Sequence, residues 1–306
     1  MSFFMELNMD VLEYFPNNIR IYLLKEINNR NYKSLEEIRI RVNRPIILKF
    51  NNEFKKLEYI ITTEDILRIL EYITENSMYS YQKQICEGYI TLRGGHRVGI
   101  SGNVVMENDK VININYIYSL NFRISKEIVG VANEISKYIY ENGSINNTLI
   151  ISPPGTGKTT ILRDLIRILS EYKTIGVVDE RGEIAAMYKN IPQNNLGIQV
   201  DILNNIPKSI GMKMLIRSMA PEIICADEIG TKEDIEAIKY AVTSGVKGIF
   251  TAHGETIENI TQNPILRELI QSNLIENIII LNKNDRKNIK CIKNIKKNID
   301  FQGKMV

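Results

Sequence analysis

The sequence predicts an α/β protein: a domain built on a parallel sheet, preceded by a smaller α+β domain. From about residue 125 onward, short apolar runs alternate with stretches of helical spacing, which is typical of a parallel sheet covered by helices on both faces. The first 124 residues lack this alternation and mix strand-like with helix-like segments. We therefore predict two domains, residues 1–124 and residues 125–306, joined by a hinge that runs to about Gly130.

The composition is typical of a soluble globular protein. Of the 306 residues, 44% are hydrophobic and 25% are charged, and the net charge of +3 is too small to indicate a nucleic-acid surface by itself. The three cysteines and two histidines lack the spacing of a structural zinc site. The sequence contains neither an apolar run long enough to span a membrane nor the start of a signal peptide. We expect a cytoplasmic protein whose contact with any membrane is peripheral.

The first domain is predicted to contain two helical segments. Apolar residues follow helical spacing over 9–27, with an interruption at Pro16. A second helix is predicted over 64–74, with Thr62 or Thr63 as its N-cap. These segments supply apolar faces that can cover a sheet.

The strands of the first domain are predicted as two pairs. The segment 37–50 reads as two short strands around a turn at 43–45. A hairpin is predicted over 89–105, because Gly94 and Gly95 stand in its turn, where positive φ angles are needed. Together with the helices, these strands predict the α+β class.

The second domain is predicted to alternate strands with helices. A helix over Lys126–Tyr140, ended by Gly143, leads into it. The predicted strands are Thr148–Ile151, Thr174–Val178, Glu222–Ala226 and Val246–Ala252. The predicted helices are Lys158–Ser170, Lys208–Met219, Lys232–Val242 with N-cap Thr231, and one that begins at Pro264 behind Asn263. The strands Ile278–Leu281 and Asn288–Ile292 are predicted to form an edge hairpin.

A glycine-rich loop after the first strand of this domain carries the strongest chemical signal. Its residues are Ser152, Pro153, Pro154, Gly155, Thr156, Gly157, Lys158, Thr159 and Thr160. The glycines let backbone N–H groups approach a phosphate, and the following helix turns its positive end toward the same anion. Lys158 is placed to reach the β- and γ-phosphates, and the Thr159 hydroxyl to ligate Mg²⁺. The loop therefore predicts an ATP site and a RecA/AAA+-like P-loop NTPase fold.

Two acids follow the strand at 222–226. Asp227 and Glu228 stand at its carboxyl end, the edge at which open α/β sheets bind ligands. We predict that Asp227 holds Mg²⁺ through water and that Glu228 orients and polarises the attacking water. This pair favours hydrolysis of ATP over kinase chemistry, in which a bound substrate is deprotonated instead.

Two further strand ends carry polar residues whose role the sequence leaves open. In the run 179–183, Glu183, and with it Glu180, either faces the metal or water or belongs to a solvated turn with an internal ion pair. His253 follows the strand at 246–252 and is either a sensor of the γ-phosphate or a structural histidine.

These four elements resemble, in kind and order, those of the secretion ATPases of type II and type IV systems and of the pilus-retraction motors. In this resemblance the acids of 179–183 match the acidic box, Glu228 the catalytic glutamate, and 251–253 the histidine box. The chain departs from those motors at Asp227, where they carry glycine, and at Val246, where they carry the first histidine of the box. An arginine also follows their glutamate closely, where this chain has Ile229 and Gly230.

A resemblance that covers nearly the whole chain is to the stage III sporulation protein AA family of endospore-forming bacteria. It is carried by the segments EIRIRVNRPI (37–46), LRGGHRVGISG (92–102), SLNFRIS (119–125), PPGTGKTT (153–160), VVDERGEIA (177–185) and ADEIG (226–230). The resemblance implies an ATPase of the mother-cell cytoplasm that forms a ring, expected to be a hexamer. It also implies partners among membrane-bound sporulation channel proteins, through which the ATPase would energise the channel between mother cell and forespore.

P-loop motors often complete the site with an arginine from a neighbouring subunit. The candidates are Arg93, Arg97, Arg123, Arg181 and Arg217. Arg123 is preferred as the arginine finger because it ends the first domain beside the hinge. The alternative for each of them is a solvated or locally paired arginine.

Two other functions stay open. A nucleic-acid-stimulated ATPase is one, because Arg39, Arg41 and Arg44 alternate with other residues along a strand. We favour a solvated strand face, since the stacking aromatics of a nucleic-acid site are missing there, and nucleic acid is not expected as a partner. The other is an ATP-gated scaffold with little turnover.

Overall fold

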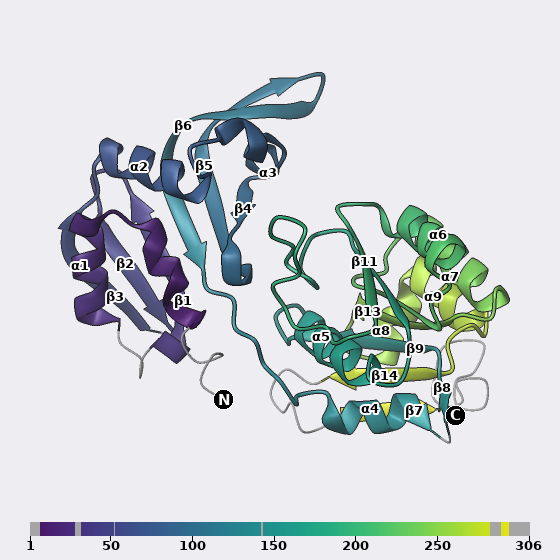
Figure 1. Ribbon diagram of the computed structural model, residues 1–306. Coiled ribbons are helices and arrows are strands. Elements are labelled where there is room, and N and C mark those ends of the chain that lie inside the picture. The colour runs from purple at the N-terminus through teal and green to yellow at the C-terminus, as the bar shows by residue number, and fades with distance from the viewer. Residues whose placement is uncertain (1–6, 28–31, 52, 142, 282–288, 294–306) are drawn as a thin grey trace. The chain divides into compact units, whose positions relative to one another are not determined.

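Two large sheets organise the chain, one antiparallel and one mainly parallel (Figure 1). The computed structural model describes residues 7–27, 32–51, 53–141, 143–281 and 289–293. The chain divides into unit 1, which comprises Met1–Glu127 and Ala186–Gln193, and unit 2, which comprises Ile128–Ala185 and Asn194–Val306. The division into folding domains 1–124 and 125–306 remains a prediction.

In the described part of unit 1, six strands form an antiparallel sheet in the order β3-β2-β1-β6-β5-β4. Their bounds are β1 Leu35–Arg41, β2 Pro45–Phe50, β3 Glu53–Ile60, β4 Tyr89–Thr91, β5 Arg97–Glu107 and β6 Lys110–Arg123. At the centre of the sheet, residues 37–41 of β1 pair with residues 119–123 of β6. The sheet therefore brings together two segments, 37–46 and 119–125, that carried the family resemblance.

Helical segments cover one face of this sheet. They are α1 Asn17–Glu26 and α2 Thr63–Ile73, with the 3-10 helix η1 Leu7–Tyr14 ahead of α1. The other helical segments described in unit 1 are short: η2 Tyr32–Ser34, η3 Met78–Tyr81, α3 Gln82–Cys86 and η4 Arg93–Gly95. Pro16 separates η1 from α1, as predicted. The hydroxyl of Thr62 accepts from Asp65 N at 3.1 Å and the Asp65 carboxylate accepts from Thr62 N at 2.9 Å, so a reciprocal cap begins α2.

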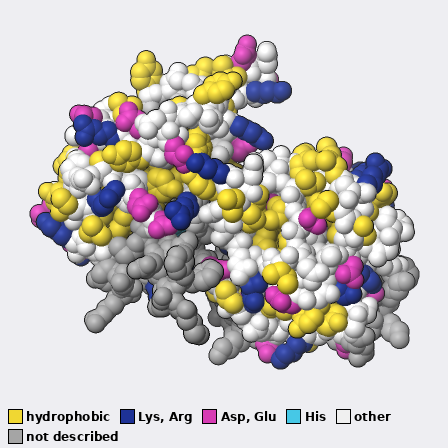
Figure 2. All heavy atoms as spheres, viewed as in Figure 1, with side chains coloured by type: hydrophobic (Ala, Val, Ile, Leu, Met, Phe, Trp, Pro, Cys, Tyr) yellow, Lys and Arg dark blue, Asp and Glu magenta, His cyan; other side chains and the backbone are white. Residues whose placement is uncertain are grey.

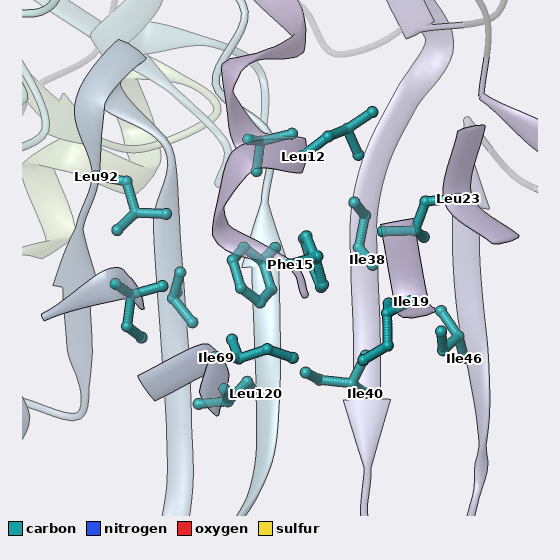
Figure 3. Packing of buried hydrophobic residues seen from close by; sticks show 14 of the residues in the cluster. Leu12, Phe15, Ile19, Leu23, Ile38, Ile40, Ile46, Ile69, Leu92 and Leu120 are labelled. Atoms are coloured by element: carbon teal, nitrogen blue, oxygen red, sulfur yellow. The ribbon is translucent and has the colours of Figure 1, made fainter. Parts of the chain in front are cut away.

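The core of unit 1 lies between these helical segments and the sheet (Figure 3). Buried side chains from both layers meet there: Leu12, Phe15, Ile19, Leu23 and Ile69 from the helical segments, and Ile38, Ile40, Ile46 and Leu120 from the strands. The rings of Phe15 and Phe122 lie 4.5 Å apart between their centroids. Because apolar burial drives folding, this layer holds the strands in register.

Segment 186–193 packs within unit 1, against residues that are distant in sequence. Gln193 Oε1 accepts a hydrogen bond from Gly94 N at 2.8 Å. Both oxygens of Glu75 are engaged: Tyr188 Oη donates to one at 2.5 Å, and Lys189 Nζ pairs with the other at 2.6 Å. Gly95 has φ 76°, and its backbone lies close to Ala186. A Cβ added at Gly95 would lie 3.2 Å from the Cβ of Ala186.

His96, beside this turn, is 2% exposed, and its Nδ1 accepts a hydrogen bond from Ser125 N at 3.0 Å. Burial lowers the pKa of His96 to about 4. An unfolded histidine has a pKa of about 6.5, so between these values the unfolded chain binds the extra proton and stability rises with pH. This contribution is fully present above pH 6.5 and is lost as the pH falls toward 4.

We expect His96 alone to lower the free energy of unfolding by about 3 kcal/mol between pH 7 and pH 4. Urea unfolding of the full chain at several pH values would measure this. The matched variant is His96→Asn, whose carbonyl can still accept from Ser125 N but does not titrate. Its stability should depend less on pH than that of the parent, and parallel pH profiles would contradict the assignment.

In the described part of unit 2, seven strands form a sheet in the order β11-β10-β12-β13-β9-β14-β15. Their bounds are β9 Thr148–Ser152, β10 Ile175–Asp179, β11 Val200–Asn204, β12 Ile223–Ala226, β13 Lys247–His253, β14 Asn277–Leu281 and β15 Ile289–Lys293. All neighbours run parallel except β14 and β15, which are antiparallel. A short hairpin of β7 Tyr140–Glu141 and β8 Ser144–Ile145 stands apart from this sheet. The predicted parallel sheet and its edge hairpin are thus confirmed.

Helices cover both faces of the parallel sheet, as the alternation predicted (Figure 1). They are α4 Asn133–Ile139, α5 Lys158–Leu169, α6 Lys208–Met219, α7 Lys232–Thr243, α8 Ile257–Gln262 and α9 Pro264–Gln271. Helices α6 to α9 share one core cluster with alternate residues of the strands, such as Leu149, Ile151 and Ile224. Helix α5 packs on β9 and β13 from the other face. Every residue of β9, β10 and β12 is consequently buried.

Among the predicted helices, the one over Lys126–Tyr140 was too long. Helix α4 begins only at Asn133, because Gly130 has φ 88° and Ala132 N donates to the buried Asp164 carboxylate at 2.8 Å. The caps of α7 at Thr231 and of α9 at Asn263 were predicted and are present. None of the described helices combines the length and the apolar character needed to cross a membrane.

Candidate active site

Four parallel strands of unit 2 end at the same edge of the sheet. In the register, His253 of β13 lies opposite Ser152 of β9, and Ala226 of β12 lies opposite Phe250 of β13. On its other side, Ala226 pairs with Val178 of β10. Since β13 separates β9 from β12, the glycine-rich loop and the Asp227-Glu228 pair face each other across the end of one strand.

The glycine-rich loop joins β9 to α5. Gly155 has φ 75° and Gly157 has φ 100°, both in the left-handed region that side chains disfavour. A Cβ at Gly155 would meet no atom within 4 Å, so the space over the loop is open at this point. Thr156 closes the turn by donating its hydroxyl to Pro153 O at 2.9 Å. The loop is thus shaped to present backbone N–H groups at the start of a helix.

The first two residues of α5 contact the opposing strand ends. Lys158 is 6% exposed, and its Nζ lies 3.2 Å from Nδ1 of His253. The Thr159 hydroxyl donates to Asp227 Oδ2 at 2.5 Å. A buried ammonium and a carboxylate-bound hydroxyl are groups that suit a polyphosphate and its metal ion.

Thr251 of β13 holds the Asp227-Glu228 pair in place. Its hydroxyl donates to Asp227 Oδ1 and accepts from Glu228 N at 2.9 Å. Glu228 has φ 54°, a left-handed conformation that costs a non-glycine residue about 1 kcal/mol or more. Strained backbone of this kind persists only where surrounding contacts hold it, and it is concentrated at functional sites.

The tip of Glu228 is engaged on both oxygens. His253 Nε2 lies 3.0 Å from Oε1, and Arg181 Nη1 lies 2.5 Å from Oε2. Together with the contact of Lys158 to His253, these bonds form a continuous chain of side chains from α5 to the turn after β10. Arg181 and His253 therefore bracket the acid, one on each carboxylate oxygen.

The acidic run 179–183 forms a tight turn at the end of β10. Asp179 is 2% exposed, and its carboxylate accepts from the backbone N–H groups of residues 183, 184 and 185 at 2.8, 3.1 and 2.8 Å. Asp179 thus stabilises the turn itself. Glu180 pairs with Lys208 at the start of α6.

A pocket of about 290 Å³ opens between the ends of β10 and β12. Its polar lining consists of Asp179, Glu180, Arg181, Glu183, Lys208, Asp227 and Glu228. Five carboxylates thus share the pocket with two cations. Backbone N–H groups already stabilise Asp179, and a further cation in the pocket would reduce the repulsion among the other four carboxylates.

The predicted site residues of unit 2 come together in this arrangement. The loop 152–160, Asp227, Glu228 and His253 are joined by the hydrogen bonds of Lys158, Thr159 and His253, and Glu183 lines the same pocket as Glu228. Arg123 ends β6 in unit 1, so the structure assigns it no distance to these residues.

Two contacts were not foreseen from the sequence. Thr251 lies in the predicted histidine box without a predicted role, although its place two residues before His253 on β13 puts both side chains on one face of the strand. Arg181 was considered as a finger for a neighbouring subunit or as a solvated or locally paired arginine, and its contact with Glu228 of its own chain was not among these predictions.

Comparison with known proteins identifies relatives over almost the full length. The family model described as "Sporulation stage III, protein AA" matches residues 6–299. Stage III sporulation protein AA of Bacillus subtilis (strain 168) is 40% identical over 280 residues, which cover 90% of this chain and 91% of that protein. Protein SEEDLING PLASTID DEVELOPMENT 1 of Arabidopsis thaliana is 33% identical over 177 residues, 56% of this chain and 25% of the plant protein.

Solved structures with the same fold include secretion and pilus ATPases. The ATPase DotB of Legionella pneumophila matches with a TM-score of 0.52 at 16% identity, covering 81% of this chain and 72% of that chain. The pilus retraction motor PilT with bound ADP matches with a TM-score of 0.57 at 13% identity, covering 86% and 77%. At these identities the likeness is one of fold, and it confirms the predicted P-loop NTPase fold with its preceding α+β unit.

Proposed function

We propose that this chain, a member of the sporulation stage III protein AA family, binds Mg-ATP at the loop 152–160 and hydrolyses it. The observation that carries the proposal is the meeting of three strand ends. There the Thr159 hydroxyl contacts Asp227, and Lys158 reaches Glu228 through His253. The PilT structure of similar fold holds ADP, which supports a nucleotide as the ligand.

The oxygen donors at this site fit a magnesium ion. Mg²⁺ prefers hard oxygen ligands and is usually held by one or two protein groups together with phosphate oxygens and water. Thr159 and Asp227 supply such oxygens 2.5 Å apart, and we assign them as the metal-binding pair, with Asp227 acting through water. When bound, the ion neutralises charge on the β- and γ-phosphates.

Glu228 is the proposed general base for the attacking water. Its backbone is fixed by Thr251 and its Oε1 by His253, so the carboxylate is preorganised at the sheet edge. His253 is assigned to sensing the γ-phosphate, and Lys158 to the β- and γ-phosphates. Glu183, on the wall of the same pocket, is assigned to orienting water or the metal.

The wider role we propose is that of a motor ATPase in endospore formation. It would act as a ring, expected to be a hexamer, in which Arg123 of one subunit completes the site of its neighbour. Its place would be the mother-cell cytoplasm, at the membrane through partners. Those partners would be membrane-bound sporulation channel proteins, and the work would be energising the channel or secretion complex.

Phosphate release by the purified full chain tests the activity. We expect steady-state hydrolysis of ATP with Mg²⁺, loss of turnover on chelation by EDTA, and recovery when Mg²⁺ is added back. The protein is assayed alone, as a ring, and with membranes from sporulating cells. If it binds ATP but shows no turnover in any of these samples, an ATP-gated scaffold is favoured instead. The mass in solution with and without ATP gives the subunit number.

The nucleic-acid-stimulated alternative is tested in the same assay. It requires that single-stranded DNA raise turnover and that this effect fade with salt. Against it, Arg39 on β1 is paired with Glu37, and Lys49 pairs with Glu36 at 2.8 Å. On the face drawn in Figure 2, Lys and Arg side chains are interspersed with Asp and Glu. Stimulation by DNA at physiological salt would contradict our choice.

A further inference from the structure

Arg181 stands on an anchored turn and carries a largely exposed side chain. The turn follows β10 and is anchored by Asp179, which accepts three backbone hydrogen bonds from residues 183–185. The Arg181 side chain is 67% exposed, yet its Nη1 lies 2.5 Å from Glu228 Oε2. An exposed guanidinium on an anchored turn can exchange one partner for another without a change in the fold.

This contact engages one of the two oxygens through which Glu228 could act on water. A general base must accept a proton from water on one of its oxygens. In Glu228, Oε1 is already engaged by His253 and Oε2 by Arg181. While the ion pair persists, the lone pairs of Oε2 that face Arg181 are directed at the guanidinium and are not available to water.

The pocket beside the pair offers the guanidinium a second position. Arg181 and Lys208 are the cations that line it, and Lys208 is paired with Glu180. Because Asp227 lines this pocket and also contacts Thr159 of the phosphate loop, the terminal phosphate of bound ATP would lie near its mouth. A guanidinium binds phosphate through two parallel charge-assisted hydrogen bonds, and a terminal phosphate carries more negative charge than one carboxylate.

We propose that Arg181 is a positioning residue that distinguishes ATP from ADP. With ADP or no nucleotide it stays on Glu228 and keeps that carboxylate from acting on water. With ATP the γ-phosphate draws the guanidinium away, which frees Oε2. The inference rests on the proposed ATP site and adds to it a regulation by the γ-phosphate.

The chain contains a matched control for a purely structural role. Lys173 and Glu222 form an ion pair of 2.6 Å at the amino ends of β10 and β12, the same two strands that Arg181 and Glu228 join at their carboxyl ends. If Arg181 only ties these strands together, Lys173→Ala and Arg181→Ala should act alike. Lys173 is far from the site along the strands, so its loss should leave nucleotide selectivity unchanged.

The test measures the dissociation constants of ADP and of a non-hydrolysable ATP analogue, both with Mg²⁺, on full-length variants. Arg181→Ala should leave the affinity for ADP within about twofold but weaken the analogue roughly tenfold or more, the size of a charge-assisted hydrogen bond. Arg181→Lys should restore part of this selectivity. Glu228→Gln should strengthen the analogue relative to ADP, because a neutral partner releases Arg181 more easily.

The outcomes separate this inference from the proposed function. Suppose that the parent chain hydrolyses ATP, but that Arg181→Ala weakens the binding of ADP and of the analogue equally or leaves both unchanged. The γ-phosphate role is then wrong and the ATPase assignment stands. The γ-phosphate role is also wrong if Lys173→Ala reproduces the loss of selectivity. If the parent chain binds neither nucleotide, both proposals fall.

Discussion

Replacing Lys158 by alanine is expected to weaken ATP binding about thirtyfold or more. Lys158 is 6% exposed at the first turn of α5, where its ammonium would meet the phosphates away from bulk water. Removing one member of a buried charge pair costs about 2–5 kcal/mol, because the other charge is left without compensation. Every 1.4 kcal/mol is about a factor of ten in the dissociation constant.

Isothermal titration with ATP and Mg²⁺ would measure this loss. Lys247→Ala is the matched control, because Lys247 is also on this sheet but pairs with Glu276 at the opposite end of its strand. Its affinity for ATP should equal that of the parent. An unchanged affinity in Lys158→Ala would mean that the phosphates bind elsewhere.

Replacing Glu228 by glutamine is expected to separate binding from hydrolysis. Glutamine has nearly the same shape and keeps one carbonyl oxygen that can accept from Arg181, so ATP should remain bound. It cannot take up a proton from water, and loss of a general base lowers the rate about 10²–10⁴-fold. Any oligomer that depends on ATP should then persist, because its nucleotide is not consumed.

Single-turnover hydrolysis and mass in solution, measured on the same sample, would test both parts of this expectation. Asp227→Asn serves as a comparison, since it should impair metal-dependent binding as well as the rate. If Glu228→Gln turned over ATP at the parent rate, another group would activate the water, and Glu183 on the same pocket wall would be the next residue to replace.

Elements with strong local signals were predictable from the sequence. Helix α6 was predicted over Lys208–Met219 and has these bounds. The N-caps Thr231 and Asn263 place the starts of α7 and α9, because their side chains bond to backbone N–H groups only a few residues away. Strands β9 and β12 are buried on both faces, and strands in that environment have nearly continuous apolar sequences, which made them recognisable.

Elements that depend on distant partners were missed. Strand β6 runs over Lys110–Arg123 and was not predicted, although Ile112 and Ile114 alternate with Asn113 and Asn115 near its start. It pairs with β5 and β1, which are its neighbours in the sheet. Strand β11 pairs with β10 at one margin of the sheet and is only half-buried, and it is too short to show a clear strand period. In both cases the backbone hydrogen bonds to a neighbour decide the conformation.

For the site, the sequence identified the strand ends but not the bonds between them. Residues at the carboxyl ends of parallel strands must gather at one edge, and this rule was enough to group Lys158, Asp227, Glu228 and His253. The contact of Arg181 with Glu228 depends on the left-handed backbone at Glu228 and on the turn that Asp179 anchors. Neither of these local geometries has a signature in the residue types alone.

The return of segment 186–193 to unit 1 bears on how this protein can be divided. A fragment that ended at residue 127 would lack the partners of Glu75 and of the Gly94 amide, although both lie within it. Because the segment is inserted between stretches of unit 2, no single cut releases either unit with all its contacts. If unit 1 is replaced by that of a homologue, by recombination or by design, segment 186–193 therefore has to be replaced with it. We expect the two units to evolve as a pair for the same reason.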